Sequence, residues 1–591
     1  MSDILVVGES NQFEVFVASR EEKFSYHDFF FVKGDGKEYL AEVVESYSIN
    51  SFLPLPGSGN EREERIISHL KTLGFKIEEE EINIGKLRFL DEPPYPLKVG
   101  SRVRRANFSE IKHIFKLKPD GLVVGVIKNT DRFYNSLPGE FKDLVEILEE
   151  GRKRDQREIP FIFGVREMAE YPHIGIFGGS GSGKSFSLRV ILEEMAKKGY
   201  PAIVFDPHFE MIFDIVDESV KGVYKNIKET VRVFTVGEDI GIDFSELSEG
   251  EVESLFSTIS EIEPPQMEAI YVAYSMMGEE KNLSNFRENL RSLGEKKAEG
   301  EIKTNVNPSS ARAVLRKLNY LIRLGIFGKG DREIISWMKD KKIAVVWGNL
   351  DTLKVFVSFL LRKLVDKRRI YKDGLKKGQI EEYFPPFFVV IDEAHNFAPK
   401  EYTFTIPSKR VIKLISQEGR KYGIFLILAT QRPSLLDDTI TAQLNTKFIF
   451  RTVRETDLLT IKKETDLSKS DIERLPYLKS GDCFVSSAIF QRSLPVRIRL
   501  SFTKTPYTEN PFEELKKEKE KEDEVVLSYI REKGLIEENM LHIALKELER
   551  RGLMLSGEDE LINILSRLSN NGKIEEVDNG IFTIWKVKDV D

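Results

Sequence analysis

The sequence has almost no cysteine and no long hydrophobic run. Its single cysteine, Cys483, excludes a disulfide within the chain and a zinc site built from several cysteines. No stretch of about 18 uncharged apolar residues is present, so we expect no membrane-spanning helix. The first residues lack the basic-then-apolar pattern of a secretory signal, and we therefore expect a cytoplasmic protein.

A strong net charge is absent as well. The formal net charge is −8, with 31% charged and 41% hydrophobic residues, a balance typical of globular proteins. The net charge of the chain therefore does not indicate nucleic-acid binding, and a surface that binds nucleic acid would have to be a local patch. A chain of 591 residues is too long for one hydrophobic core, and length alone predicts roughly three or four domains.

One glycine-rich stretch matches the phosphate-binding P-loop, G-x-x-x-x-G-K-[ST]. Its eight residues are Gly178, Gly179, Ser180, Gly181, Ser182, Gly183, Lys184 and Ser185. Glycines permit left-handed backbone conformations, so the N–H groups of such a loop can converge on a polyphosphate. In this motif the lysine reaches the β- and γ-phosphates of ATP and the serine hydroxyl binds Mg²⁺.

The residues on either side of this stretch favour a P-loop over a glycine-rich surface turn. The run His173–Phe177 is apolar enough for a buried parallel strand, and apolar residues recur at helical spacing after Phe186. The loop therefore precedes a helix whose N-terminus points at the bound anion.

A second stretch places two carboxylates directly after a buried strand. Phe387–Ile391 is apolar, and Asp392 and Glu393 follow it. We expect Asp392 to hold the metal through water and Glu393 to act as general base on the attacking water. Downstream of a P-loop, this pair predicts an ATPase that hydrolyses its nucleotide.

Three further polar residues lie near strand ends. Asp206 ends the apolar run Ala202–Asp206, where it either contacts the ligand or begins a turn. Gln431 follows the strand that ends at Thr430 and is placed to sense the γ-phosphate or orient water. Arg420 precedes the same strand and is either a solvated surface arginine or an arginine finger given to a neighbouring subunit.

The rest of the chain divides into segments of different character. Residues 1–128 contain short β-branched or aromatic runs that predict a small barrel with a structural or docking role. A helix is expected at Arg62–Thr72, and 129–170 reads as a basic, partly helical connector. Residues 243–340 are too long for a loop and predict an inserted helical subdomain. The predicted barrel strands are Ile4–Val7, Glu14–Ala18, Phe29–Lys33, Tyr39–Tyr47 and Leu122–Ile127.

The composition changes near Pro511. Residues 507–524 are predicted to be a charged linker or solvated helix, because Glu513–Glu524 is almost wholly charged. Three short helices and a hairpin with the turn Asp578-Asn579-Gly580 follow, which are the parts of a winged helix-turn-helix at 525–591. Such domains bind DNA or other proteins, and this one is not especially basic.

These motifs together resemble the HerA-like ATPases of the HerA–FtsK group. The resemblance covers roughly residues 1–506 and includes a HAS-type barrel at 1–128 and a core at 171–506. Phe209 departs from the pattern, since many relatives have glycine there. The motifs are GGSGSGKS at 178–185, DPHFE at 206–210, VVIDEAHNF at 389–397 and GRKYGIFLILATQRPS at 419–434.

The resemblance implies an α/β protein with a RecA-like P-loop ATPase core in a homo-hexameric ring that translocates double-stranded DNA. Archaeal members act with the NurA nuclease in DNA end resection. The matching residues imply a site in which Lys184, Ser185, Asp392, Glu393 and Gln431 serve ATP and Mg²⁺, with Arg420 as a finger in trans. The alternative is an ATP-driven assembly partner whose main role is to grip a protein such as a nuclease or defence effector.

Overall fold

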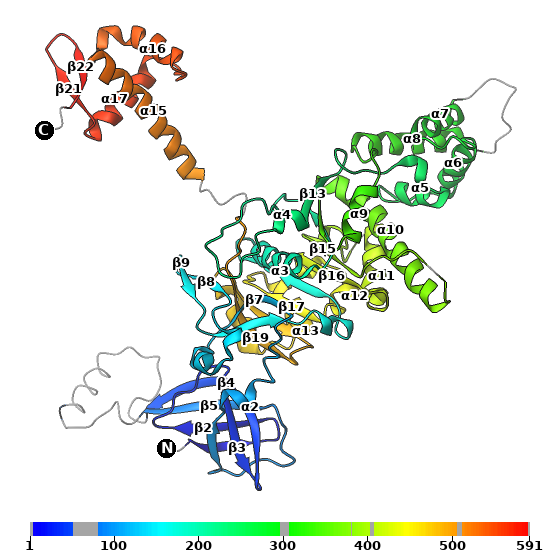
Figure 1. Cartoon of the computed structure of the whole chain (residues 1–591), viewed down its shortest axis with the longest axis vertical. Helices are drawn as coiled ribbons and strands as arrows, with labels where there is room; N and C mark the ends of the chain where they lie inside the picture. The colour runs from blue at the N-terminus through cyan, green and yellow to red at the C-terminus, as the bar shows by residue number, and fades with distance from the viewer. Residues whose placement is uncertain are drawn as a thin grey trace. The chain divides into compact units, whose positions relative to one another are not determined.

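The structure is a computed structural model that describes residues 4–50, 72, 81–295, 306–379, 381–401, 407–504 and 511–588. The chain separates into two compact units, Met1–Lys504 and Thr505–Asp591. Within the described residues, no helix is both long and apolar enough to cross a membrane. Figure 1 shows the elements of both units with the labels used below.

The first unit begins with a closed antiparallel barrel of six strands in the order β1-β2-β5-β4-β3-β6. Its interior is apolar because alternate residues of each strand point inward. The expected helix at Arg62–Thr72 lies outside the described residues, apart from Thr72. The barrel strands are β1 (Ile4–Ser10), β2 (Glu14–Ser19), β3 (Phe29–Gly34), β4 (Lys37–Asn50), β5 (Glu81–Phe89) and β6 (Arg102–Arg105).

The core is an eleven-stranded sheet in the order β10-β7-β19-β18-β17-β11-β16-β15-β12-β14-β13. The strands from β17 to β13 run parallel, and those from β18 outward are antiparallel. Its strands are β7 (Leu122–Ile127), β10 (Ile159–Phe163), β11 (Ile174–Phe177), β12 (Ala202–Asp206), β13 (Val231–Thr235), β14 (Ile343–Trp347), β15 (Phe387–Ile391), β16 (Ile424–Thr430), β17 (Thr446–Ile449), β18 (Asp482–Ser487) and β19 (Arg492–Ile498).

One sequence prediction about the early strands is wrong. Leu122–Ile127 is not a barrel strand, because β7 pairs with β10 and β19 of the core sheet. The connector at 129–170 is partly helical, as predicted, through three short 3-10 helices, and it also supplies β10 and the hairpin β8 (Glu146–Glu149) and β9 (Arg152–Asp155). An apolar run shows that a strand is buried, but it does not show which sheet buries it.

Helices cover both faces of the parallel strands. Successive residues of β15 alternate between faces, so Val389 packs with α10 and α11 while Val390 packs with α3. The inserted helices α5 to α8 join the same apolar core as α10. These helices are α3 (Lys184–Lys198), α4 (Ile227–Thr230), α5 (Glu249–Phe256), α6 (Pro264–Ser275), α7 (Leu283–Gly294), α8 (Pro308–Arg323), α9 (Arg332–Lys339), α10 (Leu350–Lys376) and α11 (Pro407–Tyr422). Smaller helices are α2 (Phe108–Ile111), α12 (Asp438–Ala442), α13 (Glu455–Glu464) and α14 (Lys469–Arg474).

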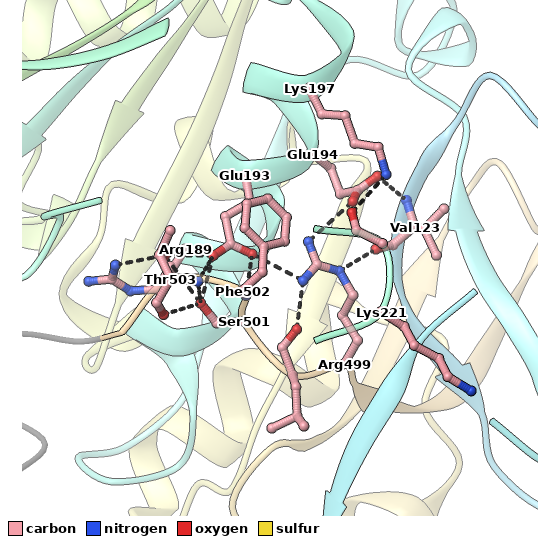
Figure 2. Close-up of polar contacts among 12 residues, drawn as sticks. Val123, Arg189, Glu193, Glu194, Lys197, Lys221, Arg499, Ser501, Phe502 and Thr503 are labelled. Carbon is pink, nitrogen blue, oxygen red and sulfur yellow. Dashed lines mark hydrogen bonds and ion pairs between the residues drawn. The ribbon is translucent and has the colours of Figure 1, made fainter. Parts of the chain in front are cut away.

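The last segment of the first unit is bonded to α3 (Figure 2). Glu193 and Glu194 are buried on this helix, and the Arg499 guanidinium pairs with them at 3.0 and 3.2 Å. Glu193 also accepts hydrogen bonds from the backbone N–H of Thr503 at 2.9 Å and from its hydroxyl at 2.6 Å. Residues 499–503 therefore form a strap across the helix that follows the P-loop. Buried carboxylates are stable only when paired in this way.

The second unit has the parts of a winged helix: three helices and a three-stranded sheet in the order β20-β22-β21. The charged segment at 513–524 is not a separate linker, because it forms the exposed first half of α15. Its elements are α15 (Pro511–Lys533), β20 (Leu535–Glu537), α16 (Leu541–Arg550), α17 (Glu558–Asn570), β21 (Ile574–Asp578) and β22 (Thr583–Val587).

Candidate functional site: a P-loop facing a carboxylate pair

The glycine-rich loop joins β11 to α3 at the carboxyl edge of the parallel strands. Gly181 and Gly183 have φ values of 67° and 102°, which side chains with a Cβ rarely adopt. Gly183 has a second reason to be glycine, since an added Cβ would lie 2.8 Å from the backbone nitrogen of Gly481. The first turn of α3 follows directly, and its N–H groups have no partner within the helix. The loop therefore presents backbone donors to an anion.

Lys184 lies against the two carboxylates that follow β15. Its Nζ is 2.5 Å from Oδ1 of Asp392 and 3.2 Å from Oε1 of Glu393. All three side chains are at most 5% exposed. Burial alone would lower the pKa of Lys184, but the two carboxylates outweigh burial and the pKa is raised. Lys184 is therefore a fixed cation between two anions.

One carboxylate oxygen of the pair has no protein partner. Oδ2 of Asp392 and Oγ of Ser182 are buried without a hydrogen-bond partner, whereas Oε1 of Glu393 is paired with Lys184. An unpaired buried acceptor is costly, and a bound cation with its waters would satisfy Oδ2 of Asp392. Within the described residues, no group of three His, Cys, Asp or Glu side chains could hold a metal ion. The unpaired oxygen of Asp392 fits a Mg²⁺ ion that takes its other ligands from phosphate and water.

Glu393 is held in an unusual conformation at this edge. Its φ is 47°, in the left-handed region, which is uncommon for a residue with a side chain. Its Oε2 accepts the backbone N–H of Gln431 at 3.2 Å and lies 3.4 Å from Nδ1 of His395. Burial lowers the pKa of His395, despite the opposing effect of Glu393, and its Nδ1 is 2.9 Å from Oγ1 of Thr430. The structure thus brings Glu393 and Gln431 together from neighbouring strands.

The loop after β12 shows how Asp206 is used. Its two carboxylate oxygens accept the backbone N–H groups of His208 at 3.1 Å and Met211 at 2.8 Å. Burial raises the pKa of Asp206, with Asp392 adding to this effect. Phe209 has a φ of 58°, in the left-handed region that favours glycine. Asp206 therefore organises a turn, the second of its two expected roles.

Arg420 lies at the opposite edge of the sheet from the P-loop. It precedes β16, which runs parallel to β11, and its guanidinium donates to the carbonyl of Glu170, just before β11 begins. His173 fastens the same edge, since its ring accepts the N–H of Leu426 at 2.9 Å and donates to the carbonyl of Ser416 at 3.1 Å. Burial lowers the pKa of His173 to about 4, so the ring is neutral. The seven residues of β16 separate Arg420 from the carboxyl edge by about 20 Å.

Two hydrogen bonds that hold the P-loop in place could not be predicted from the sequence. The N–H of Gly481 donates to the carbonyl of Ser182 at 3.0 Å, and the carbonyl of Arg451 accepts the N–H of Gly179 at 2.9 Å. Both belong to segments that are far from the loop in sequence. The residues Ser480-Gly481-Asp482 predict a turn before β18. The sequence near this turn does not indicate that it contacts Ser182.

The comparisons with known proteins agree with this geometry. Residues 148–364 match the family model described as "Helicase HerA, central domain". The DNA double-strand break repair helicase HerA of Saccharolobus solfataricus is 25% identical over 339 residues, 55% of this chain and 64% of that protein. The same-named protein of Sulfurisphaera tokodaii is 27% identical over 380 residues, 61% and 71% of the two chains. The match thus spans just under two thirds of the first of these relatives.

Among solved structures, VirB4 of Thermoanaerobacter pseudethanolicus is similar over 62% of this chain and 97% of that chain. The sequence identity is 14% and the TM-score is 0.41.

The chain contains a RecA-like P-loop ATPase core, which is defined by the order of the strands in the sheet, by the P-loop and by the acids at the strand ends. The family match is confined to the central region, residues 148–364, and the resemblance to the HerA-like ATPases is confirmed.

Proposed function

We propose that this chain is an ATP-driven motor that translocates double-stranded DNA. The observation that carries the proposal is the buried cluster of Lys184, Asp392 and Glu393 beneath a P-loop. Gly178 to Ser185 would hold the phosphates of ATP, and Ser185 and Asp392 would hold Mg²⁺. Bound ATP–Mg²⁺ supplies the phosphoanhydride bond whose hydrolysis drives movement. The relatives named as DNA repair helicases support DNA as the substrate.

Each site residue has a distinct task in this proposal. Lys184 exchanges a carboxylate partner for phosphate oxygens, which leaves Asp392 free to bind the metal through water. Glu393 accepts the proton of the attacking water, and the N–H of Gln431 fixes the direction of its carboxylate. The side chain of Gln431 is partly exposed and would contact the water or the γ-phosphate.

We further propose that the working form is a homo-hexameric ring that acts in the cytoplasm in DNA end processing, together with a NurA-like nuclease. The position of Arg420 at the amino edge supports a ring, because this arginine reaches a nucleotide only in a neighbouring subunit. The limits 171–506 for the ATPase core remain a prediction of this proposal.

A second candidate function, an ATP-driven assembly partner that grips a protein, is favoured by the C-terminal unit. Arg567 is the one basic residue of α17, and its guanidinium pairs with Asp523 at 2.7 Å and Glu522 at 3.2 Å. A recognition helix needs free cations to meet phosphates. The second unit is therefore better suited to protein contact than to reading DNA.

DNA-stimulated ATP turnover separates the two functions. We expect linear duplex DNA to raise the ATPase rate of the wild-type chain several-fold. Lys184→Ala should bind ATP poorly and hydrolyse none with or without DNA, because the P-loop cation is gone. Lys198→Ala, at the exposed far end of α3, is the matched control and should behave as wild type. An ATPase rate that duplex DNA leaves unchanged would favour the assembly partner, and normal turnover by folded Lys184→Ala would end the P-loop assignment.

Truncation after Thr508 tests the role of the second unit. We expect basal ATPase activity and ring formation to persist, since the strap at 499–503 is retained, while binding to DNA or a protein partner weakens. Truncation after Ile498 is the control, because it leaves Glu193 and Glu194 buried without Arg499 and should destabilise the fold by about 3–5 kcal/mol. Native mass spectrometry and ATPase assays check both forms. Loss of the ring in the longer form would show that the tail is structural.

A further inference from the structure

A pocket of about 280 Å³ opens next to the P-loop, at the beginning of β18. Its walls come from the turn before β18, from β19 and from the β8–β9 hairpin. The lining residues used below are Glu149, Glu150, Tyr477, Leu478, Lys479 and Arg497. None of them has a role in the phosphate chemistry described above.

One residue, Gly481, separates this pocket from the phosphate-binding loop. On one side its N–H bonds to the carbonyl of Ser182, and its nitrogen would lie 2.8 Å from a Cβ at position 183. On the other side, the Arg497 guanidinium would lie 3.6 Å from a Cβ at position 481. A ligand that begins on the P-loop and extends past Gly481 therefore enters the pocket.

The sheet order shows which end of a nucleotide extends this way. Lys184, Asp392 and Glu393 meet on the side of β11 that leads through β16 to β15. The terminal phosphate, the metal ion and the bond that water attacks would lie next to these three charged side chains. The pocket lies on the other side of β11, beyond β17, where β18 begins. The nucleoside end must leave the P-loop toward β18.

We propose that this pocket receives the base and ribose of the nucleotide and that Tyr477 stacks on the base; this inference rests on the proposed ATP site. Tyr477 is 85% exposed, and no hydrogen bond or ring contact of its side chain is found in the described part of the chain. An exposed aromatic ring at a pocket rim offers a stacking face for a base.

The remaining lining residues suit the ribose. Arg497 already donates to the carbonyl of Ser480 and to Asp482, both at 2.8 Å, so it shapes the pocket without offering many free donors. The exposed carboxylates of Glu149 and Glu150 pair with Arg154 at 2.6 Å and with Lys479 at 3.7 Å, and their second oxygens would accept hydrogen bonds from ribose hydroxyls.

Binding of ATP and of inorganic tripolyphosphate to the full chain tests the proposal. We expect Tyr477→Ala to weaken ATP binding by about 10-fold, the effect of losing one base-stacking contact, while tripolyphosphate binding stays unchanged. Tyr477→Phe should bind ATP like wild type because the ring is retained. Tyr95→Ala, which removes another exposed tyrosine at 70% exposure, is the control.

The outcomes separate this proposal from the one on which it rests. If wild type binds neither ligand, the ATP site itself is wrong and the pocket assignment falls with it. If wild type binds ATP and Tyr477→Ala binds it equally well, the ATP site stands and the pocket assignment is wrong. Equal weakening of ATP and tripolyphosphate, or a loss of DNA affinity alone, would also overturn the role of Tyr477.

Discussion

Arg420→Ala is expected to lower ATP turnover by about 10³- to 10⁵-fold, the effect of losing an arginine finger. This corresponds to roughly 4–7 kcal/mol of activation free energy. The reason is geometric, because Arg420 lies at the amino edge of the sheet and its own P-loop lies at the carboxyl edge. A surface arginine would change turnover very little. Lys421→Ala, the adjacent exposed cation, is the matched control and should retain wild-type turnover.

Mixed rings show in which subunit Arg420 acts. Arg420→Ala subunits keep an intact P-loop, and Lys184→Ala subunits keep Arg420. Mixing two inactive variants should therefore restore activity at interfaces where a Lys184→Ala subunit supplies its arginine to an Arg420→Ala neighbour. ATPase assays on rings whose mixed composition is confirmed by native mass spectrometry check this result. A complete lack of rescue would contradict a role in trans.

Glu393→Gln should bind ATP normally and hydrolyse it about 10²- to 10⁴-fold more slowly, as expected for removal of a general base. Asp392 and its 2.5 Å contact with Lys184 remain, so the nucleotide and metal sites persist. The amide still accepts the N–H of Gln431 but cannot take the proton of water. Glu401→Gln, at an exposed position eight residues along the chain, controls for the loss of one negative charge.

Single-turnover hydrolysis and equilibrium ATP binding, measured on the same preparations, distinguish chemistry from binding. Hydrolysis by Glu393→Gln near the wild-type rate would assign the base to another group, with Gln431 the next residue to test. Weak ATP binding by this variant would instead show that Glu393 helps to form the nucleotide site.

The proximity of the P-loop lysine to the acids after β15 was predictable from sequence because the signals are local. The P-loop, the acids after β15 and the residue after β16 each lie at the end of an apolar run, and parallel strands bring such ends to one edge. Asp206 was less certain, because a strand-end acid can serve a ligand or a turn. The structure shows its carboxylate bonded to the backbone of its own loop.

Long-range partners could not be predicted in this way. The placement of β7 in the core sheet depends on pairing with β19, more than 360 residues later in the chain, and apolar composition is the same in either sheet. The contact between Gly183 and Gly481 likewise joins distant segments. The charged stretch at 513–524 reads equally as linker or helix, because alternating charges are compatible with both.

The strap at 499–503 also has a mechanical consequence. Residues 505–591 are joined to the rest of the chain through Lys504, directly after the segment that Glu193 and Glu194 hold. A pulling force on the C-terminal unit is therefore transmitted both to the loop at Ile215, through Lys504, and to the helix that starts at Lys184, through Glu193. Tension from a captured partner would be delivered to the element that presents the phosphate-binding lysine.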